Sequence, residues 1–180
     1  MSLSEHREMF DVLLQDTDCA AARSVLDAGS GRTSLGILTE KFPHSVIDAV
    51  CFPGDRRKLD SIVANVARAN YRLIERDICK PAEWGEYDFI VAHLLLGEAV
   101  KFGNNFGALL GSLIAIKGKH LVIIDYPEDP GVDFERIFAD CRAAGYETVR
   151  EHTVKKTEPL YGSSGELIGT YYRGVLFKLV

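Results

Sequence analysis

A strand-to-helix turn is encoded by Ser24-Val25-Leu26-Asp27-Ala28-Gly29-Ser30-Gly31-Arg32-Thr33-Ser34-Leu35-Gly36. The apolar pair Val25–Leu26 predicts a short buried strand that ends in an acid, Asp27. Gly29 and Gly31 follow as a Gly-x-Gly turn, in which missing Cβ atoms let a ligand approach the main chain. A carboxylate at this point repels a pyrophosphate and attracts a free amino group. The segment predicts a βα unit that receives a nucleotide-like ligand, and a purely structural turn is the alternative.

Segments typical of strands alternate with segments typical of helices through most of the chain. After the first strand, the expected strands are Ser45–Phe52, Tyr71–Arg76, Tyr87–Ala92 and His120–Asp125. The expected helices are Ser4 to about Arg23, Thr33–Lys41, Asp55–Asn70, Glu98–Ile116 and Phe134–Ala144. The last two of these strands are nearly continuous apolar runs, as in strands buried on both faces at the centre of a parallel sheet.

The end of the chain changes character. Tyr146–Lys156 and Gly169–Val180 are both rich in β-forming residues, and the turn material Tyr161–Gly165 lies between them. These features predict a C-terminal antiparallel hairpin, with the loop Thr157–Ile168 available as a lid. The fold class is therefore α/β, with a doubly wound, mostly parallel sheet that has an antiparallel edge and helices on both faces.

Composition narrows the class of protein. The chain has 180 residues, 47% hydrophobic and 26% charged, as in a single domain of a soluble protein. Its formal net charge of −5 argues against a nucleic-acid partner. No apolar run or signal peptide points to a membrane. The cysteines lack metal-ligand spacing and predict reduced thiols, no bound metal and a cytoplasmic location; they are Cys19, Cys51, Cys79 and Cys141.

The pattern Asp27-x-Gly-x-Gly resembles motif I of the Rossmann-like (class I) S-adenosylmethionine (SAM) methyltransferases. That motif reads apolar-apolar-Asp/Glu-x-Gly-x-Gly-x-Gly, and Thr33 stands here for its third glycine. The resemblance covers Ser24–Val180, preceded by an N-terminal helix within residues 1–23. It implies a seven-stranded sheet of order 3-2-1-4-5-7-6, SAM as cofactor and S-adenosylhomocysteine (SAH) as product.

The resemblance also implies which positions contact the cofactor. Asp27 would orient the methionine amino group while amides of the glycine turn meet the carboxylate and ribose region. Cys51 stands where family members commonly place an acid for the ribose hydroxyls, and cysteine cannot replace a bidentate carboxylate. Phe52 would lie against the adenine or pack in the core. The implied cofactor positions are Asp27, Ala28, Gly29, Ser30, Gly31, Cys51, Phe52, Asp77, Ile78 and His93.

The third and fourth strand ends supply the remaining candidates. Asp77 would accept from the adenine amine and the Ile78 N–H would donate to the ring, with a turn cap as the alternative role of Asp77. His93 faces the transferred methyl group in the family and is the candidate catalytic base, with a structural role as the alternative. The fifth strand end, Asp125–Asp129, either receives a cationic or hydroxylated substrate or is a solvated acidic loop.

The favoured function is methyl transfer from SAM to a small-molecule or other soluble acceptor. One alternative is a non-catalytic SAM-fold subunit in a homo- or hetero-oligomer, because Cys51 departs from the family pattern. Another is a nicotinamide-dependent oxidoreductase, because Gly29–Ser34 also reads as Gly-x-Gly-x-x-Ser. Against this, Asp27 lies where phosphates would bind, and Cys51 lacks the expected acid.

Overall fold

The computed structural model describes residues 3–54, 66, 70–80, 83–101, 103–162, 165 and 167–180. Its strands are β1 Ser24–Ala28, β2 Val46–Cys51, β3 Tyr71–Glu75, β4 Phe89–His93, β5 His120–Asp125, β6 Tyr146–Tyr161 and β7 Leu167–Leu179. Its helices are α1 Leu3–Leu13, α2 Arg32–Lys41, α4 Leu96–Lys101, α5 Phe106–Ala115 and α6 Phe134–Ala143. Of the predicted helix Asp55–Asn70, only Val66 and Asn70 lie within the described residues.

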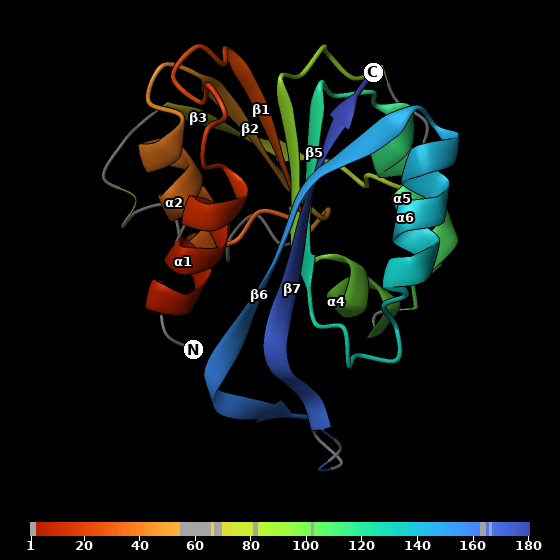
Figure 1. Ribbon diagram of the computed structural model, residues 1–180. Helices are drawn as coiled ribbons and strands as arrows, with labels where there is room; N and C mark the ends of the chain where they lie inside the picture. Colours follow the sequence, from red (N-terminus) through yellow and green to blue (C-terminus); the bar gives the residue numbers. More distant parts are fainter. Residues whose placement is uncertain are drawn as a thin grey trace.

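The strands form one seven-stranded sheet in the order β3-β2-β1-β4-β5-β7-β6 (Figure 1). The pairs β3–β2, β2–β1, β1–β4 and β4–β5 are parallel, whereas β7 is antiparallel to both β5 and β6. The predicted doubly wound sheet, its strand order and its terminal hairpin are confirmed.

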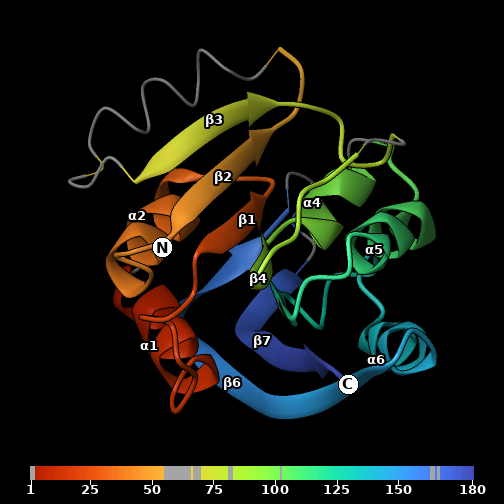
Figure 2. The same ribbon diagram turned by 90° about the horizontal axis from the view of Figure 1, so that it is seen from above.

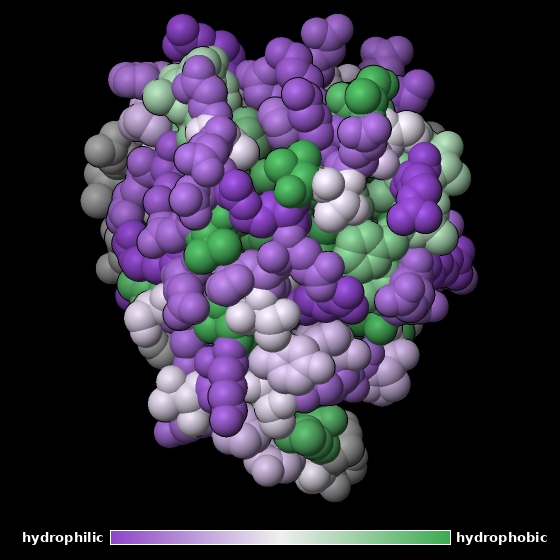
Figure 3. Space-filling model, viewed as in Figure 1, coloured by the Kyte–Doolittle hydropathy of each residue, from purple (hydrophilic) through white to green (hydrophobic). Residues whose placement is uncertain are grey.

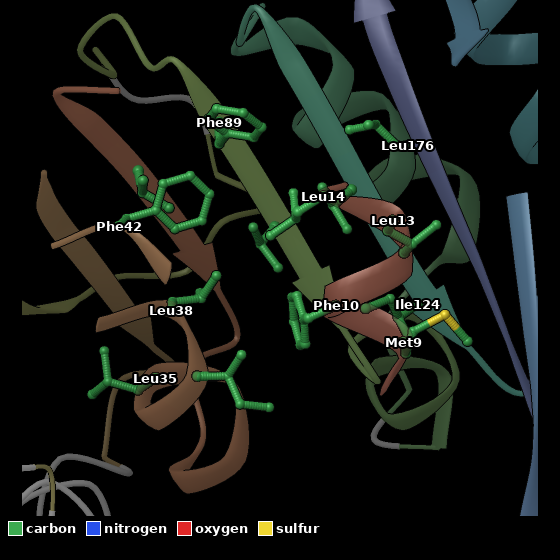
Figure 4. Packing of buried hydrophobic residues seen from close by; sticks show 14 of the residues in the cluster. Met9, Phe10, Leu13, Leu14, Leu35, Leu38, Phe42, Phe89, Ile124 and Leu176 are labelled. Carbon is green, nitrogen blue, oxygen red and sulfur yellow. The ribbon is translucent and has the colours of Figure 1, made fainter. Parts of the chain in front are cut away.

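Two layers of helices enclose the sheet (Figure 2). On one face α1 and α2 pack over a cluster that includes Phe10, Leu38 and Phe89 (Figure 4). On the other face α4, α5 and α6 contribute Leu96, Leu110 and Ile137 to a second cluster. Successive residues of β1, β4 and β5 alternate between the two clusters, because neighbouring side chains of a strand point to opposite faces.

The structure divides the predicted helix Glu98–Ile116 into α4 and α5. Between them Gly103 adopts φ +82°, which interrupts right-handed helical geometry. Asn105 then starts α5, since its side chain accepts a hydrogen bond from Ala108 N at 3.0 Å. The turn at Gly103 and the N-cap at Asn105 thus divide a segment that apolar periodicity alone predicts to be one helix.

The two ends of the chain also differ from expectation. Helix α1 ends at Leu13 rather than near Arg23, and the Arg150 guanidinium donates to the carbonyl oxygens of Val12 and Gln15 just at that end. The hairpin strands β6 and β7 include most of the predicted Thr157–Ile168 loop. They continue beyond the sheet as a two-stranded ribbon (Figure 1), with Tyr161 and Leu167 exposed near its end. On the face drawn in Figure 3, hydrophilic residues predominate, and a hydrophobic patch lies at the end of this ribbon.

Gly174→Ala is expected to destabilise the protein by about 1–3 kcal/mol, because overpacking a filled core has that cost. A Cβ at Gly174 would overlap Met9 Sδ and lie 2.7 Å from Leu13 Cδ1, which pushes α1 away from β7. Gly111→Ala in α5 is the matched control, since its Cβ meets no described atom within 4 Å. The control should gain up to about 1 kcal/mol from helix propensity. Urea unfolding measures both, and equal effects of the two substitutions would contradict this packing argument.

Candidate functional site

The carboxyl ends of the parallel strands bring most of the predicted site residues to one edge of the sheet. The last residue of β1, Ala28, lies in register with Val50 on one side and Ala92 on the other. Ser30 N donates to Val50 O at 2.8 Å and holds the glycine turn against β2. The turn therefore lies between the ends of β2 and β4, as a ligand site at a topological switch point requires.

Asp27 is a buried carboxylate with one unsatisfied oxygen. Its Oδ2 accepts hydrogen bonds from Ser30 Oγ at 2.5 Å and Ser34 Oγ at 3.0 Å. Its Oδ1 is enclosed and has no hydrogen-bond partner among the described residues. Burial raises the pKa of Asp27 to about 7, against the lowering effect of the two hydroxyls. A donor with positive charge would satisfy Oδ1 and stabilise the ionised form.

The two glycines of the turn have different reasons to lack a side chain. Gly29 has φ +69°, and a Cβ there would overlap Leu95 Cδ1, so backbone conformation and packing both require glycine. Gly31 has an extended backbone with φ −137° and is the N-cap residue that precedes α2. No described atom lies within 4 Å of a Cβ built at Gly31. Among the described residues the space beside Gly31 is thus open, in the turn that follows Asp27.

The end of β2 presents one buried and one exposed side chain. Cys51 is buried, whereas Phe52 is 50% exposed. The core-packing alternative for Phe52 is therefore wrong, and its ring is available to a ligand. Glu75 on β3 lies in register with Cys51 and accepts a hydrogen bond from Gly54 N at 2.8 Å. The sequence analysis overlooked Glu75, which comes directly before Arg76, the last residue of the predicted strand. Its carboxylate group is on the residue that pairs with Cys51, where the family commonly has an acid.

After β3, Asp77 forms a turn within its own segment. Its Oδ1 accepts from Cys79 N at 3.0 Å, and its Oδ2 lies 3.8 Å from Lys80 Nζ. The turn-capping role is therefore present, and among the described residues the second carboxylate oxygen has only a long contact with an exposed lysine. Ile78 is buried in the cluster beneath α4 and α5, which fixes the backbone around it.

His93 at the end of β4 is buried against a second histidine. Its Nε2 lies 2.9 Å from Nδ1 of His6 on α1. Burial lowers the pKa of His93 to about 3 and that of His6 to about 4, the latter assisted by the positive charge of Lys156. A general base works best with a pKa near the operating pH. This arrangement argues against proton acceptance by His93 and favours another use of its ring.

Sequence reasoning did not find His6, although a signal was available. His6 precedes Met9, Phe10 and Leu13 by three, four and seven positions, which places it on the apolar face of α1. A histidine on such a face is buried and needs a polar partner. Which partner it meets depends on the packing of α1 against the distant end of β4.

The acidic strand end after β5 is structural rather than a solvated loop. The buried Asp125 carboxylate accepts from Leu96 N at 2.9 Å and Gly97 N at 3.2 Å, and so satisfies the start of α4. Burial raises its pKa to about 6. Asp129 is also buried and pairs with Lys101 Nζ at 2.9 Å. The expectation of a solvated acidic loop is wrong for both side chains.

The described residues show neither a metal-binding cluster nor a membrane-spanning helix. No group of three or more His, Cys, Asp or Glu side chains there is arranged to hold a metal ion. No helix formed by those residues has both the length and the apolar character needed to span a membrane.

Comparison with known proteins identifies the fold. Magnesium protoporphyrin IX methyltransferase from Synechocystis, solved with bound SAM, matches with TM-score 0.70 and 16% identity over 98% of this chain and 81% of its own. N-methyltransferase NodS from Bradyrhizobium japonicum, in complex with SAH, matches with TM-score 0.68 and 13% identity over 98% of this chain and 86% of its own. An O-methyltransferase family protein from Burkholderia thailandensis matches with TM-score 0.68 and 15% identity over 98% of this chain and 57% of its own.

The chain therefore has the Rossmann-like fold of the class I SAM-dependent methyltransferases. No protein-family model and no curated protein matches its sequence. At these levels of identity the likeness establishes the fold, and the function has to be argued from the site.

Proposed function

We propose that this protein is a SAM-dependent methyltransferase that acts on a small-molecule or other soluble acceptor in the cytoplasm. One observation carries the proposal: the buried Asp27 carboxylate keeps an unsatisfied oxygen, and the space beside Gly31 in the same turn is open among the described residues. SAM carries an ammonium group, which is the kind of donor that Asp27 Oδ1 lacks. The solved neighbours with bound SAM or SAH support the same ligand class.

The described residues suit the parts of SAM to different degrees. Asp27 would take the ammonium group, and the open backbone at Gly31 would let the methionine portion approach α2, whose N-terminus favours a carboxylate. The exposed Phe52 ring would cover the adenine. Asp77 Oδ2 and the Ile78 N–H would recognise its edge. Glu75 is our candidate for a ribose hydroxyl, because Cys51 offers no carboxylate there.

When bound, SAM supplies an electrophilic methyl group. The remaining task of the protein is to align the acceptor with this methyl group. Because binding holds both reactants in place, most of the entropy cost of bringing them together is met before the chemical step. The strand ends of β1 and β4 are adjacent in the sheet, so Asp27 and His93 lie on neighbouring strands of one rigid element. This arrangement suits a cofactor anchored at β1 and an acceptor held near β4.

Isothermal titration calorimetry with SAM and SAH tests the proposal directly. We expect both to bind at micromolar concentration, and we expect NAD and NADP, as matched controls, to give no heat. Binding of NAD or NADP instead of SAM would favour an oxidoreductase. Light scattering on the same sample detects a homo-oligomer. No heat from any ligand would reject the enzyme proposal and favour the non-catalytic subunit.

A further inference from the structure

A row of buried polar side chains leads from the β6–β7 hairpin to the end of β4. Its members, all buried, are Lys156 on β6, Tyr172 on β7, His6 on α1 and His93 on β4. Lys156 Nζ donates to Tyr172 Oη at 3.0 Å, and Tyr172 Oη lies 3.4 Å from His6 Nε2. The contact of 2.9 Å between His6 Nδ1 and His93 Nε2 completes the row.

The lysine sets the direction of hydrogen bonding at Tyr172. An ammonium group only donates, so Lys156 occupies one lone pair of the Tyr172 oxygen. Tyr126 Oη donates to the same oxygen at 3.4 Å and occupies the second. The hydroxyl hydrogen of Tyr172 is then left for the remaining neighbour, which is His6 Nε2.

The direction continues through the two imidazoles. The low pKa values of His6 and His93 keep both rings neutral at pH 7, so each ring has one N–H. His6 accepts at Nε2, and its hydrogen is therefore on Nδ1, which donates to His93 Nε2. His93 accepts at Nε2 in turn, and its hydrogen is on Nδ1. The described residues form a hydrogen bond to His93 through Nε2 and none through Nδ1, and Nδ1 is not one of the enclosed polar atoms that lack a partner.

We propose that Lys156, Tyr172 and His6 are positioning residues that hold His93 as a neutral donor, with its Nδ1–H offered to an anionic oxygen of the methyl acceptor. The acceptor class rests on the proposed methyl transfer, whereas the direction of the hydrogen-bond chain does not. His93 is then the residue that touches the substrate, and the other three act through it.

The N–H donor selects oxygen over nitrogen as the acceptor atom. An amine nitrogen has one lone pair, and a hydrogen bond from His93 would block the pair that must attack. A carboxylate or phenolate oxygen accepts this bond and keeps another lone pair for the methyl carbon. Its new C–O bond forms as the bond from the methyl carbon to sulfur breaks, and the two opposite charges cancel. No proton moves, so the low basicity of His93 is no obstacle.

Two-bond ¹H–¹⁵N correlation spectra of the full chain, recorded without SAM at pH 7, test the chain directly. Both His6 and His93 should be neutral Nδ1–H tautomers, with Nε2 unprotonated. Tyr172→Phe and Lys156→Met should each convert His93 to a mixture of tautomers, because the ordered donation is lost. Lys155→Met is the matched control, since Lys155 is the exposed neighbour on the same strand, and it should leave the spectrum unchanged.

An Nε2–H or a charged His93 in the wild-type protein would overturn the proposal. So would an Nδ1–H tautomer that persists unchanged in both Tyr172→Phe and Lys156→Met. Circular dichroism confirms that each variant is folded before its tautomer is assigned. Because SAM is absent from the sample, the expected spectra together with a failed SAM titration would reject the methyltransferase assignment and leave the hydrogen-bond chain intact.

Discussion

Gly31→Val is expected to remain folded and to weaken SAM binding by roughly a hundredfold or more, which is about 3 kcal/mol. Valine suits the extended backbone of Gly31, and its Cβ meets no described atom within 4 Å. Its cost to folding should stay near 1 kcal/mol, because valine is a poorer N-cap than glycine. The branched side chain would fill the space assigned to the methionine portion of SAM. Calorimetry and urea unfolding measure the two effects separately.

Gly29→Ala is the contrasting variant in the same turn. Because Gly29 has φ +69° and a Cβ there would overlap Leu95 Cδ1, we expect the alanine substitution to reduce the stability of the fold. We expect a loss of about 1–3 kcal/mol in stability, from backbone strain together with overpacking. If Gly31→Val lost stability as Gly29→Ala does, or if it bound SAM normally, the space beside Gly31 would not be the cofactor site.

Asp27→Asn should reduce SAM affinity by roughly a hundredfold while it increases stability at neutral pH, as expected when a buried charge with an unpaired oxygen is removed. The raised pKa of Asp27 determines how the stability of the fold changes with pH. Folded Asp27 keeps its proton up to about pH 7, whereas the unfolded carboxyl loses it near its ordinary pKa. Wild-type stability therefore falls as the pH rises through this interval, and the asparagine variant should lose the part of this fall that Asp27 causes, while the buried Asp125 keeps its own part. Urea unfolding from pH 4 to pH 8 measures it.

Ligand binding should reveal the same ionisation. An ammonium group prefers the ionised carboxylate, so SAM affinity should rise by up to about tenfold per pH unit below the pKa of Asp27 and level off above it. Titrations in buffers of different ionisation enthalpy should detect proton release near pH 6. The matched control is Asp125→Asn, because this buried carboxylate serves α4 and should leave the proton release unchanged. Affinity independent of pH in the wild-type protein would contradict the role of Asp27.

Short sequence patterns correctly predicted the strands and turns whose structure depends on residues close together in the chain. His120–Asp125 is a strand with the predicted bounds, and the turn after Asp27 has its expected form. The break at Gly103 was missed because apolar periodicity continues on both sides of it. The helix also ended early at Leu13, where the contact with Arg150 comes from β6 and has no local signal.

The candidate site was predictable in part for the same reason. Asp27 and Gly31 are four positions apart in the chain and belong to the same strand-to-helix turn. His6 and His93 are 87 positions apart, and their contact depends on how α1 packs over the sheet. The function of Asp125 was likewise hidden, since its partners are the first amides of a helix that precedes it in the chain.

Arg150 joins the end of α1 to β6 across 138 positions of sequence. This contact closes a very long loop. The entropy cost of closing the loop has to be offset before the contact can stabilise the fold. Docking of α1 therefore depends on a hairpin strand that lies 138 positions further along the chain. Amide hydrogens of α1 and β6 are expected to exchange with solvent together, as one cooperative unit that opens and closes as a whole.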